Sequence, residues 1–330
     1  MVARDDLGYE LRIGAHTPPH GWWVISTLLA GALTKYRRDG AGVVSKVGVV
    51  TPRHSMGSLQ NPKAIGRGDL DIAICNPPIT AKWAMEGRGP YSEPVGNLRA
   101  IARFPEADYT IWLVDETFGI TSLEQIAERR IPLRVVSGRM GPEGPDPISF
   151  VIEEVMNAYG FGQKALESWG GKVIHAGHTG NGVQVMKRGE ADALFQEAAF
   201  NRAWDDLVAS RPMRALPISR DVIDKLNAKW GMEEATVPGD RFPGMAGPLP
   251  TIHYGGWLVF CRDDLPDELA YLVAKTCVDI SEEVGAPQLP RPVNYRALEV
   301  PITPKLLSSR CVIPLHPGAE RFYREIGAIE

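Results

Sequence analysis

The stretch that decides the fold is Gly68-Asp-Leu-Asp-Ile-Ala-Ile-Cys75, in which an acidic turn runs directly into four apolar residues. A short apolar run bounded by a turn is typical of a strand buried on both faces of a parallel sheet. A similar stretch, Gly189-Glu-Ala-Asp-Ala-Leu-Phe195, occurs in the second half of the chain. Two such stretches, each a helix end, an acidic turn and a buried strand, predict two lobes of related design.

Strands and helices alternate around the first stretch. We expect strands at residues 9–13, 43–50, 71–75, 98–104 and 109–114, and helices at 22–37 and 58–66. Alternation of β-rich runs with helical periodicity predicts an α/β protein built from doubly wound βαβ units.

The second half repeats this order. We expect helices starting at Ser122, with Gln125 completing a capping box, and at 148–159 and 182–188, and strands at 133–137, 172–175 and 191–195. A strand at 251–261 and helices at 265–284 and 315–329 follow. The Pro- and Gly-rich segment 237–250 is expected to cross between lobes. The predicted fold is two doubly wound βαβ lobes around a central ligand cleft, with residues 9–114 and 250–330 in lobe 1 and 115–249 in lobe 2.

Composition excludes several classes of protein. The chain has 330 residues, 44% hydrophobic and 23% charged, which suits two globular domains. Its net charge is -4 and no concentrated basic run occurs, so no nucleic-acid partner is expected. No apolar stretch is long enough to span a bilayer, so membrane insertion is not expected either.

Four cysteines, at positions 75, 261, 277 and 311, show neither a CxxC motif nor metal-ligand spacing. They are expected to be buried thiols, and no cofactor is expected. Residues 1–10 do not resemble a secretion leader. Two locations therefore stay open: the periplasm if a leader was removed, and the cytoplasm if Met1 is the native start.

Several motifs resemble the TAXI family of TRAP-transporter solute receptors. Met56-Gly-Ser-Leu-Gln-Asn61, followed by residues 68–74, is similar to that family's Gly-Ser-x-x-Asn … Gly-x-x-Asp-x-Ala pattern. Residues 98–106, 264–268 and 316–327 resemble later parts of the family in the same order. The resemblance implies a type II periplasmic-binding-protein fold, a small ligand such as an amino acid or dicarboxylate, and a TRAP-type membrane permease as partner.

The chain departs from the family pattern in two loops. Pro19-His-Gly-Trp-Trp23 stands where the family has roughly Gly-Gly-Thr-Tyr-Tyr, and residues 138–147 replace a Gly-Ser-Gly-Thr loop. Both departures bear on the identity of the ligand.

Three glycine-bearing loops, at residues 15–21, 53–58 and 137–147, each lead from a strand end to a helix start. Such loops face the ligand crevice in open α/β sheets, and helix N-termini favour anions. Arg103 and Arg139 are candidate two-pronged clamps for a carboxylate. The predicted ligand-binding residues are His16, Thr17, His20, Trp22, Gly57, Ser58, Asn61, Asn76, Arg103, Ser137, Arg139 and Glu197.

Some of these residues have a purely structural alternative. Gly57 and Ser58 can simply form a turn and a helix cap. Trp22 and Trp23 cannot share one helical face, so either one lines the cleft or both pack in the core. Glu197 either accepts a hydrogen bond from a ligand amine or hydroxyl, or satisfies a helix dipole.

Two histidine pairs, His16 with His20 and His175 with His178, raise the question of a metal site. No metal is predicted, because no carboxylate lies within either pair and the first pair sits in a proline-broken loop. The leading hypothesis is non-catalytic capture of a small carboxylate. The alternative is a cytosolic decarboxylase or lyase using His20 and His178, and a third option is a cytosolic ligand sensor. No nucleophile elbow, phosphate loop or dinucleotide motif is present.

Overall fold

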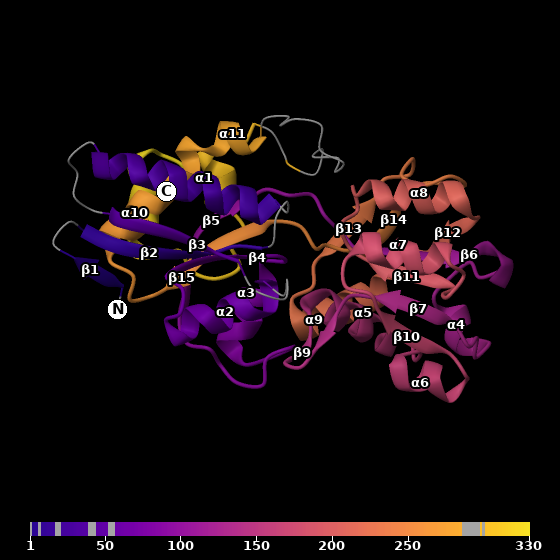
Figure 1. The fold of residues 1–330 in the computed structure, drawn as a ribbon. Coiled ribbons are helices and arrows are strands. Elements are labelled where there is room, and N and C mark those ends of the chain that lie inside the picture. The colour runs from indigo at the N-terminus through magenta and orange to yellow at the C-terminus, as the bar shows by residue number, and fades with distance from the viewer. Residues whose placement is uncertain are drawn as a thin grey trace. The chain divides into compact units, whose positions relative to one another are not determined.

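In a computed structural model the chain forms two compact units (Figure 1). The structure describes residues 2–5, 8–16, 21–38, 44–51, 57–285, 298 and 301–330. Within this part of the chain, unit 1 runs up to Glu106 and resumes at Gly255, and unit 2 comprises Ala107–Tyr254. The described chain therefore passes from unit 1 to unit 2 near residue 106 and back near residue 254.

Unit 1 is built on a mixed sheet. Its described strands are β1 (Ala3–Asp5), β2 (Gly8–Gly14), β3 (Val44–Val50), β4 (Ile72–Cys75), β5 (Leu98–Phe104) and β15 (Trp257–Arg262). β2 pairs in parallel with β3 and β4, whereas β15 lies antiparallel between β4 and β5. Every residue of β4 is buried, as expected for a strand covered on both faces.

Helices cover both faces of this sheet, with α1 and α10 on one face and α2 and α3 on the other (Figure 1). The described helices of unit 1 are α1 (Gly21–Arg38), α2 (Gly57–Arg67), α3 (Ile79–Glu86), α10 (Asp267–Asp279), α11 (Ser281–Gly285), α12 (Pro304–Leu307) and α13 (Pro317–Glu325).

Unit 2 has a five-stranded sheet in the order β10-β7-β11-β6-β12. Its strands are β6 (Ile111–Asp115), β7 (Arg134–Ser137), β10 (Lys172–His175), β11 (Ala193–Gln196) and β12 (Met213–Ala215). Two further sheets have two strands each: β8 (Met140–Gly141) with β9 (Gly144–Pro145), and β13 (Glu234–Val237) with β14 (Leu249–Ile252). β10, β7 and β11 are parallel, so their carboxyl ends share one edge of the sheet.

The helices of unit 2 are the 3-10 turn η1 (Glu116–Phe118), α4 (Glu124–Glu128), α5 (Pro147–Ala158), α6 (Gln163–Ser168), α7 (Thr179–Lys187), α8 (Arg202–Ser210) and α9 (Arg220–Trp230). On one face of the sheet, Val136 and Leu194 form a buried core with Val183 of α7 and with Trp204 and Leu207 of α8.

The predicted α/β class with two doubly wound units is confirmed, although each sheet is mixed rather than wholly parallel. The boundaries differ from the expected ones. Residues 111–114 belong to unit 2, because β6 pairs with β11 and β12. The expected single strand at 251–261 is divided between β14 of unit 2 and β15 of unit 1. The crossing therefore lies near residue 254, and not in segment 237–250.

Two helix starts also differ from expectation. Leu123, and not Ser122, is the N-cap of α4, while Thr121 and Gln125 hydrogen-bond each other across the first turn. The helix expected at 182–188 begins at Thr179, because His178 caps it: Nδ1 of His178 accepts the N–H of Asn181.

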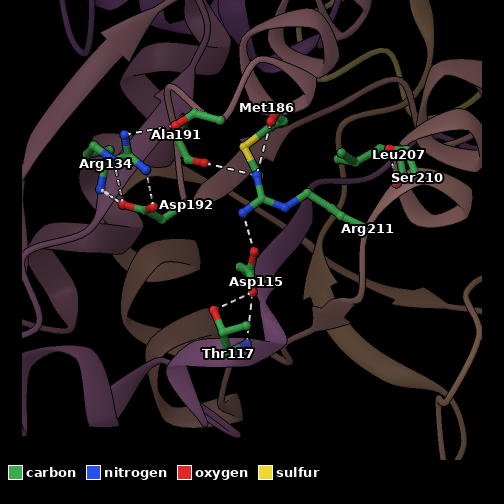
Figure 2. A network of polar contacts seen from close by, with 10 residues as sticks. Asp115, Thr117, Arg134, Met186, Ala191, Asp192, Leu207, Ser210 and Arg211 are labelled. Atoms are coloured by element: carbon green, nitrogen blue, oxygen red, sulfur yellow. Dashed lines mark hydrogen bonds and ion pairs between the residues drawn. The ribbon is translucent and has the colours of Figure 1, made fainter.

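The two acidic turns perform the same task in the two units. Asp71 accepts hydrogen bonds from Arg12 N, Nε and Nη2 at 2.8, 3.1 and 3.0 Å. Asp192 accepts the same three from Arg134 at 2.9, 2.9 and 2.6 Å, as Figure 2 shows. Each guanidinium also donates to the carbonyl of the glycine that opens the turn, Gly68 or Gly189. The repeated geometry supports the related design predicted from the sequence.

Arg211 completes the network in Figure 2. Its Nη1 donates to the carbonyls of Met186 and Ala191 at 3.0 and 3.1 Å, and its Nη2 pairs with Asp115. Asp115 also accepts the backbone N–H and the hydroxyl of Thr117. These bonds tie the end of β6 to the ends of α7 and α8 and so stabilise this end of the sheet.

Candidate functional site

In unit 1, Ser58 and Asn76 meet at the carboxyl end of β4. Oγ of Ser58 donates to the carbonyl of Asn76 and accepts the backbone N–H of Asn76 at 3.0 Å. Asn76 directly follows β4, so these bonds fasten the start of α2 to the end of the buried strand. Ser58 is only 7% exposed, and its hydroxyl proton is used within the protein. We refer to this arrangement as a helix–strand tie.

Asn61 and Tyr91 strengthen the same junction. Nδ2 of Asn61 donates to the carbonyl of Ile74 at 2.8 Å, one turn further along α2. The hydroxyl of Tyr91 donates to the carbonyls of Ser58 and Leu59 at 3.0 and 3.2 Å. Both side chains are buried. The polar residues of the Gly-Ser-x-x-Asn motif therefore position the helix start through backbone groups.

The start of α1 packs on the start of α2. The ring of His16 contacts the ring of Trp22 edge-on, with centroids 5.1 Å apart. A Cβ added to Gly57 would lie 2.9 Å from Cζ3 of Trp22, so this glycine permits the close approach of the indole. Three predicted site residues, His16, Trp22 and Gly57, thus lie together. Thr17 and His20 lie outside the described residues.

Arg103 lies on β5 and is 6% exposed. Its Nη2 donates to the carbonyl of Gly255 at 3.2 Å, where the chain re-enters unit 1. The guanidinium is thus held at least in part by the crossing segment, and its action as a carboxylate clamp stays a prediction.

Unit 2 contains a second helix–strand tie at the equivalent place. Oγ1 of Thr179, the first residue of α7, donates to the carbonyl of Glu197, which directly follows β11. Thr179 and Glu197 are 18 residues apart in the chain, and so are Ser58 and Asn76. Thr179 therefore corresponds to Ser58, and Glu197 corresponds to Asn76. Gln196, the last residue of β11, adds a bond from Nε2 to the carbonyl of Gly177 at 2.7 Å.

His178 and Arg139 lie beside this second tie. A Cβ added to Gly177 would be 3.4 Å from Nη2 of Arg139. Burial, and to a smaller extent the positive charge of Arg139, lowers the pKa of His178. Because Nδ1 of His178 accepts the N–H of Asn181, its neutral ring carries the proton on Nε2. The imidazole can therefore donate a hydrogen bond to an anion at neutral pH.

In the loop at residues 137–147, a carboxylate of the loop itself accepts the backbone N–H groups. The carboxylate of Asp146, the N-cap of α5, accepts the N–H groups of Ser149 and Arg139, both at 2.9 Å. The N-terminus of α5 is thus neutralised internally, which does not favour the expected anion cradle there. Ser137, at the end of β7, keeps a buried Oγ without a hydrogen-bond partner in the described structure.

Two acids that the sequence reasoning missed lie on the first crossing segment. Oε2 of Glu106 accepts Nδ2 of Asn76 at 3.1 Å in unit 1. In unit 2, Asp108 is 3% exposed and accepts the N–H groups of Tyr109, Ala198 and Ala199. The signal in the sequence was Glu106-Ala-Asp108, two acids within a link between two apolar strands.

No group of three or more His, Cys, Asp or Glu side chains among the described residues is placed to hold a metal ion. The four cysteines are buried free thiols, and burial raises their pKa values, which makes them poor nucleophiles. In the described part of the chain, no helix combines the length and apolar character that crossing a membrane requires.

A surface cavity of about 330 Å³ in unit 1 is lined by Lys63, Gly66, Arg67 and residues 91–95. None of these is a predicted ligand-binding residue. Nε of Arg67 pairs with Asp69 at 2.7 Å, and Nζ of Lys63 lies 5.8 Å from the centre of the Tyr91 ring. This cavity therefore does not carry the site.

The structure brings the predicted residues together in two groups. His16, Trp22, Gly57, Ser58, Asn61, Asn76 and Arg103 lie in unit 1, and Ser137, Arg139, His178 and Glu197 lie in unit 2. Each group lies around a helix–strand tie at the carboxyl ends of strands, where α/β sheets bind their ligands. Their contact with a ligand stays a prediction.

Comparison with known proteins gives the family. PhnD1 from Prochlorococcus marinus (MIT 9301), solved in complex with methylphosphonate, is similar with a TM-score of 0.52 and 12% identity, over 97% of this chain and 98% of that chain. A TRAP periplasmic solute-binding protein from Sulfitobacter sp. NAS-14.1 with bound β-D-galacturonate gives a TM-score of 0.42 and 11% identity, over 81% and 78% of the chains. The first likeness supports the fold, and the second is too weak to carry an argument.

The sequence itself matches the NMT1-like family over residues 25–327, which is nearly the whole chain. The finer TAXI assignment stays a prediction. The chain therefore belongs to the NMT1-like family.

Proposed function

We propose that this protein is a solute-binding protein that captures a small anionic ligand, carboxylate- or phosphonate-bearing, for a TRAP-type permease. The observation that carries the proposal is the repeated helix–strand tie, Ser58 with Asn76 and Thr179 with Glu197. Each tie holds the start of a helix at the carboxyl end of a parallel strand, and helix starts offer backbone N–H groups to an anion. The phosphonate complex of PhnD1, a protein of the same fold, supports a small anion as ligand.

His178 and Arg139 give the second unit its selectivity for an anion in this proposal. Arg139 supplies a permanent positive charge, and the neutral ring of His178 supplies a donor at Nε2. A lowered pKa keeps the ring of His178 neutral at pH 7, and Nδ1 already accepts the N–H of Asn181, so the ring presents Nε2–H to a ligand as a donor.

The test is a thermal-shift screen of the purified chain with amino acids, dicarboxylates, aromatic acids and methylphosphonate. A ligand at about 100 times its Kd adds about 2.7 kcal/mol to the free energy of unfolding, which raises the melting temperature measurably. Hits are then incubated with the protein and recovered by chromatography. A binding protein returns the compound unchanged. Consumption of the compound would establish the decarboxylase or lyase alternative, and the absence of any shift would reject an anionic ligand of these classes.

A further inference from the structure

The first crossing segment supplies one carboxylate to the strand-end residue of each unit. In unit 1, Glu106 receives the side-chain amide of Asn76. In unit 2, Asp108 accepts the N–H groups of Ala198 and Ala199, which directly follow Glu197, and its carboxylate is within hydrogen-bonding reach of the Glu197 side chain. Because Asn76 and Glu197 are equivalent residues of the two helix–strand ties, the two pairs are equivalent as well, except that an amide in one is a carboxyl group in the other.

Asp108 is held in a pocket of backbone donors. Its Oδ1 accepts the N–H groups of Tyr109 and Ala199, both at 2.8 Å, and its Oδ2 accepts the N–H of Ala198 at 3.1 Å. Ala198 has a φ of +62°, which lets the two successive N–H groups converge on one carboxylate. Three N–H donors stabilise the ionised form of Asp108. Burial acts in the opposite direction and is the largest influence, so the pKa of Asp108 is raised.

An ionised carboxylate has no proton to donate, so a hydrogen bond between two carboxyl groups requires one proton. Both oxygens of Asp108 already accept backbone N–H groups, and the bond with Glu197 lowers the pKa of Asp108, as a donor to its ionised form does, which assigns the proton to Glu197. We propose that Asp108 is a positioning residue that binds Glu197 through one shared proton, so that the carboxyl group at the end of β11 carries no charge at neutral pH. A neutral Glu197 is the counterpart of the Asn76 amide, and it does not repel an anionic ligand.

Other charged and titratable groups lie around this pair. The charged and titratable groups on the neighbouring elements include His178, Arg139, Tyr109, Arg241, Asp205 and Asp240, together with Lys187 of α7 and Arg202 and Asp206 of α8. Arg241 donates to the carbonyl of Ala199 and pairs with Asp205 at 2.7 Å. Burial raises the pKa of Tyr109 to about 12 and lowers that of His178, so both are neutral near pH 7. When pH rises, the shared proton passes to solvent and a second negative charge remains.

The decisive experiment needs no ligand. Urea unfolding of wild type and Glu197→Gln is compared from pH 5 to pH 9. A carboxyl group whose pKa is raised by folding stabilises the protein at low pH, and this stability is lost as pH rises through the folded pKa. The side-chain amide of E197Q donates an N–H group to Asp108 and does not titrate between pH 5 and pH 9. We therefore expect wild type to lose stability relative to E197Q as pH rises. Parallel pH profiles would overturn the proposal.

Two further variants keep the result interpretable. Glu190→Gln removes an exposed acid of the same unit and should follow the wild-type profile. Glu197→Asn, which copies the residue of unit 1, replaces E197Q if that variant does not fold. An infrared band of a protonated carboxylic acid at pH 7, present in wild type and absent in E197Q, is expected as the direct signature, and its absence from wild type would also refute the shared proton.

The consequence for ligand binding rests on the proposed function, but the unfolding experiment does not. If no solute in the screen binds, the proposed function fails while the shared proton is still tested. If methylphosphonate binds, its affinity should fall about tenfold, or about 1.4 kcal/mol, between pH 6 and pH 9 in wild type and much less in E197Q, since the added negative charge repels the anion.

Discussion

Gly256 packs so closely on Arg103 that a Cβ at this position would lie 2.2 Å from Nε of the guanidinium group. The glycine has a φ of +98°, a backbone conformation that other residues adopt only under strain. Its carbonyl also accepts Nδ2 of Asn76 at 3.1 Å. The returning chain therefore contacts both Arg103 and Asn76, two residues that the sequence singled out for ligand binding.

The first prediction concerns Gly256→Ala. We expect a loss of about 2–4 kcal/mol in the free energy of unfolding, from backbone strain and from displacement of Arg103. Gly96→Ala is the matched control, because Gly96 has a φ of +106° and open space around it. It should cost only the backbone term, about 1–2 kcal/mol. Equal losses in urea titrations would mean that Arg103 moves aside freely.

Ser58→Ala and Thr179→Val test the two helix–strand ties. Each removes the hydroxyl that donates to a strand-end carbonyl, of Asn76 or of Glu197, and should cost about 1–2 kcal/mol of stability. Thr179→Ser keeps the hydroxyl and should retain most of the stability. The structure thus assigns Ser58 a structural effect in addition to the ligand contact expected from the sequence. Unchanged melting temperatures in both variants would argue against the ties.

Asp192→Asn tests the arginine clamp of unit 2. The asparagine places an N–H₂ group against Arg134, so we expect a loss of about 1–3 kcal/mol in urea unfolding. Glu190→Gln breaks the exposed Arg188–Glu190 pair close by and should leave the stability nearly unchanged, because solvent screens such a pair. The clamp would lose its assigned importance if the two variants were equally stable.

His316→Asn tests a pH dependence of stability. Burial lowers the pKa of His316, whose Nδ1 accepts the N–H of Gly318 at 3.2 Å. The unfolded chain takes up a proton near pH 6.5, whereas the folded ring stays neutral, so stability is complete above that pH and falls below it. Asparagine preserves an acceptor but does not titrate. Between pH 7.5 and pH 5, wild type should lose stability more steeply than H316N, and equal slopes would contradict this account.

Arg139→Ala tests the ligand site. The side chain is partly exposed, so we expect the variant to fold with nearly unchanged stability. Loss of a charge-assisted hydrogen bond should weaken binding of a screen hit by about 10- to 100-fold, measured by calorimetry. Arg188→Ala, an exposed arginine of the same unit, should bind like wild type. Wild-type affinity in R139A would remove Arg139 from the site.

Much of the fold could be predicted from local patterns. The strands 98–104 and 172–175 match β5 and β10 residue for residue, because apolar runs between turn residues encode buried strands directly. The segment 251–261 could not be divided correctly, since its residues are β-forming throughout and only pairing with β13 or with β4 and β5 separates β14 from β15. The site residues were recognised by type and loop position, yet the partners of their side chains were not predictable.

The sequence by itself determined the α/β class, the two related halves and the loops at the strand ends, because these follow from the period of apolar residues and from turn chemistry within short windows. Only the tertiary structure decided that the hydroxyl of Ser58 turns to Asn76, that Asp146 occupies the start of α5, and that Asp108 meets Glu197. Those contacts join residues distant in the chain, and their free energy depends on burial and on donor geometry that exist only once the sheets have packed.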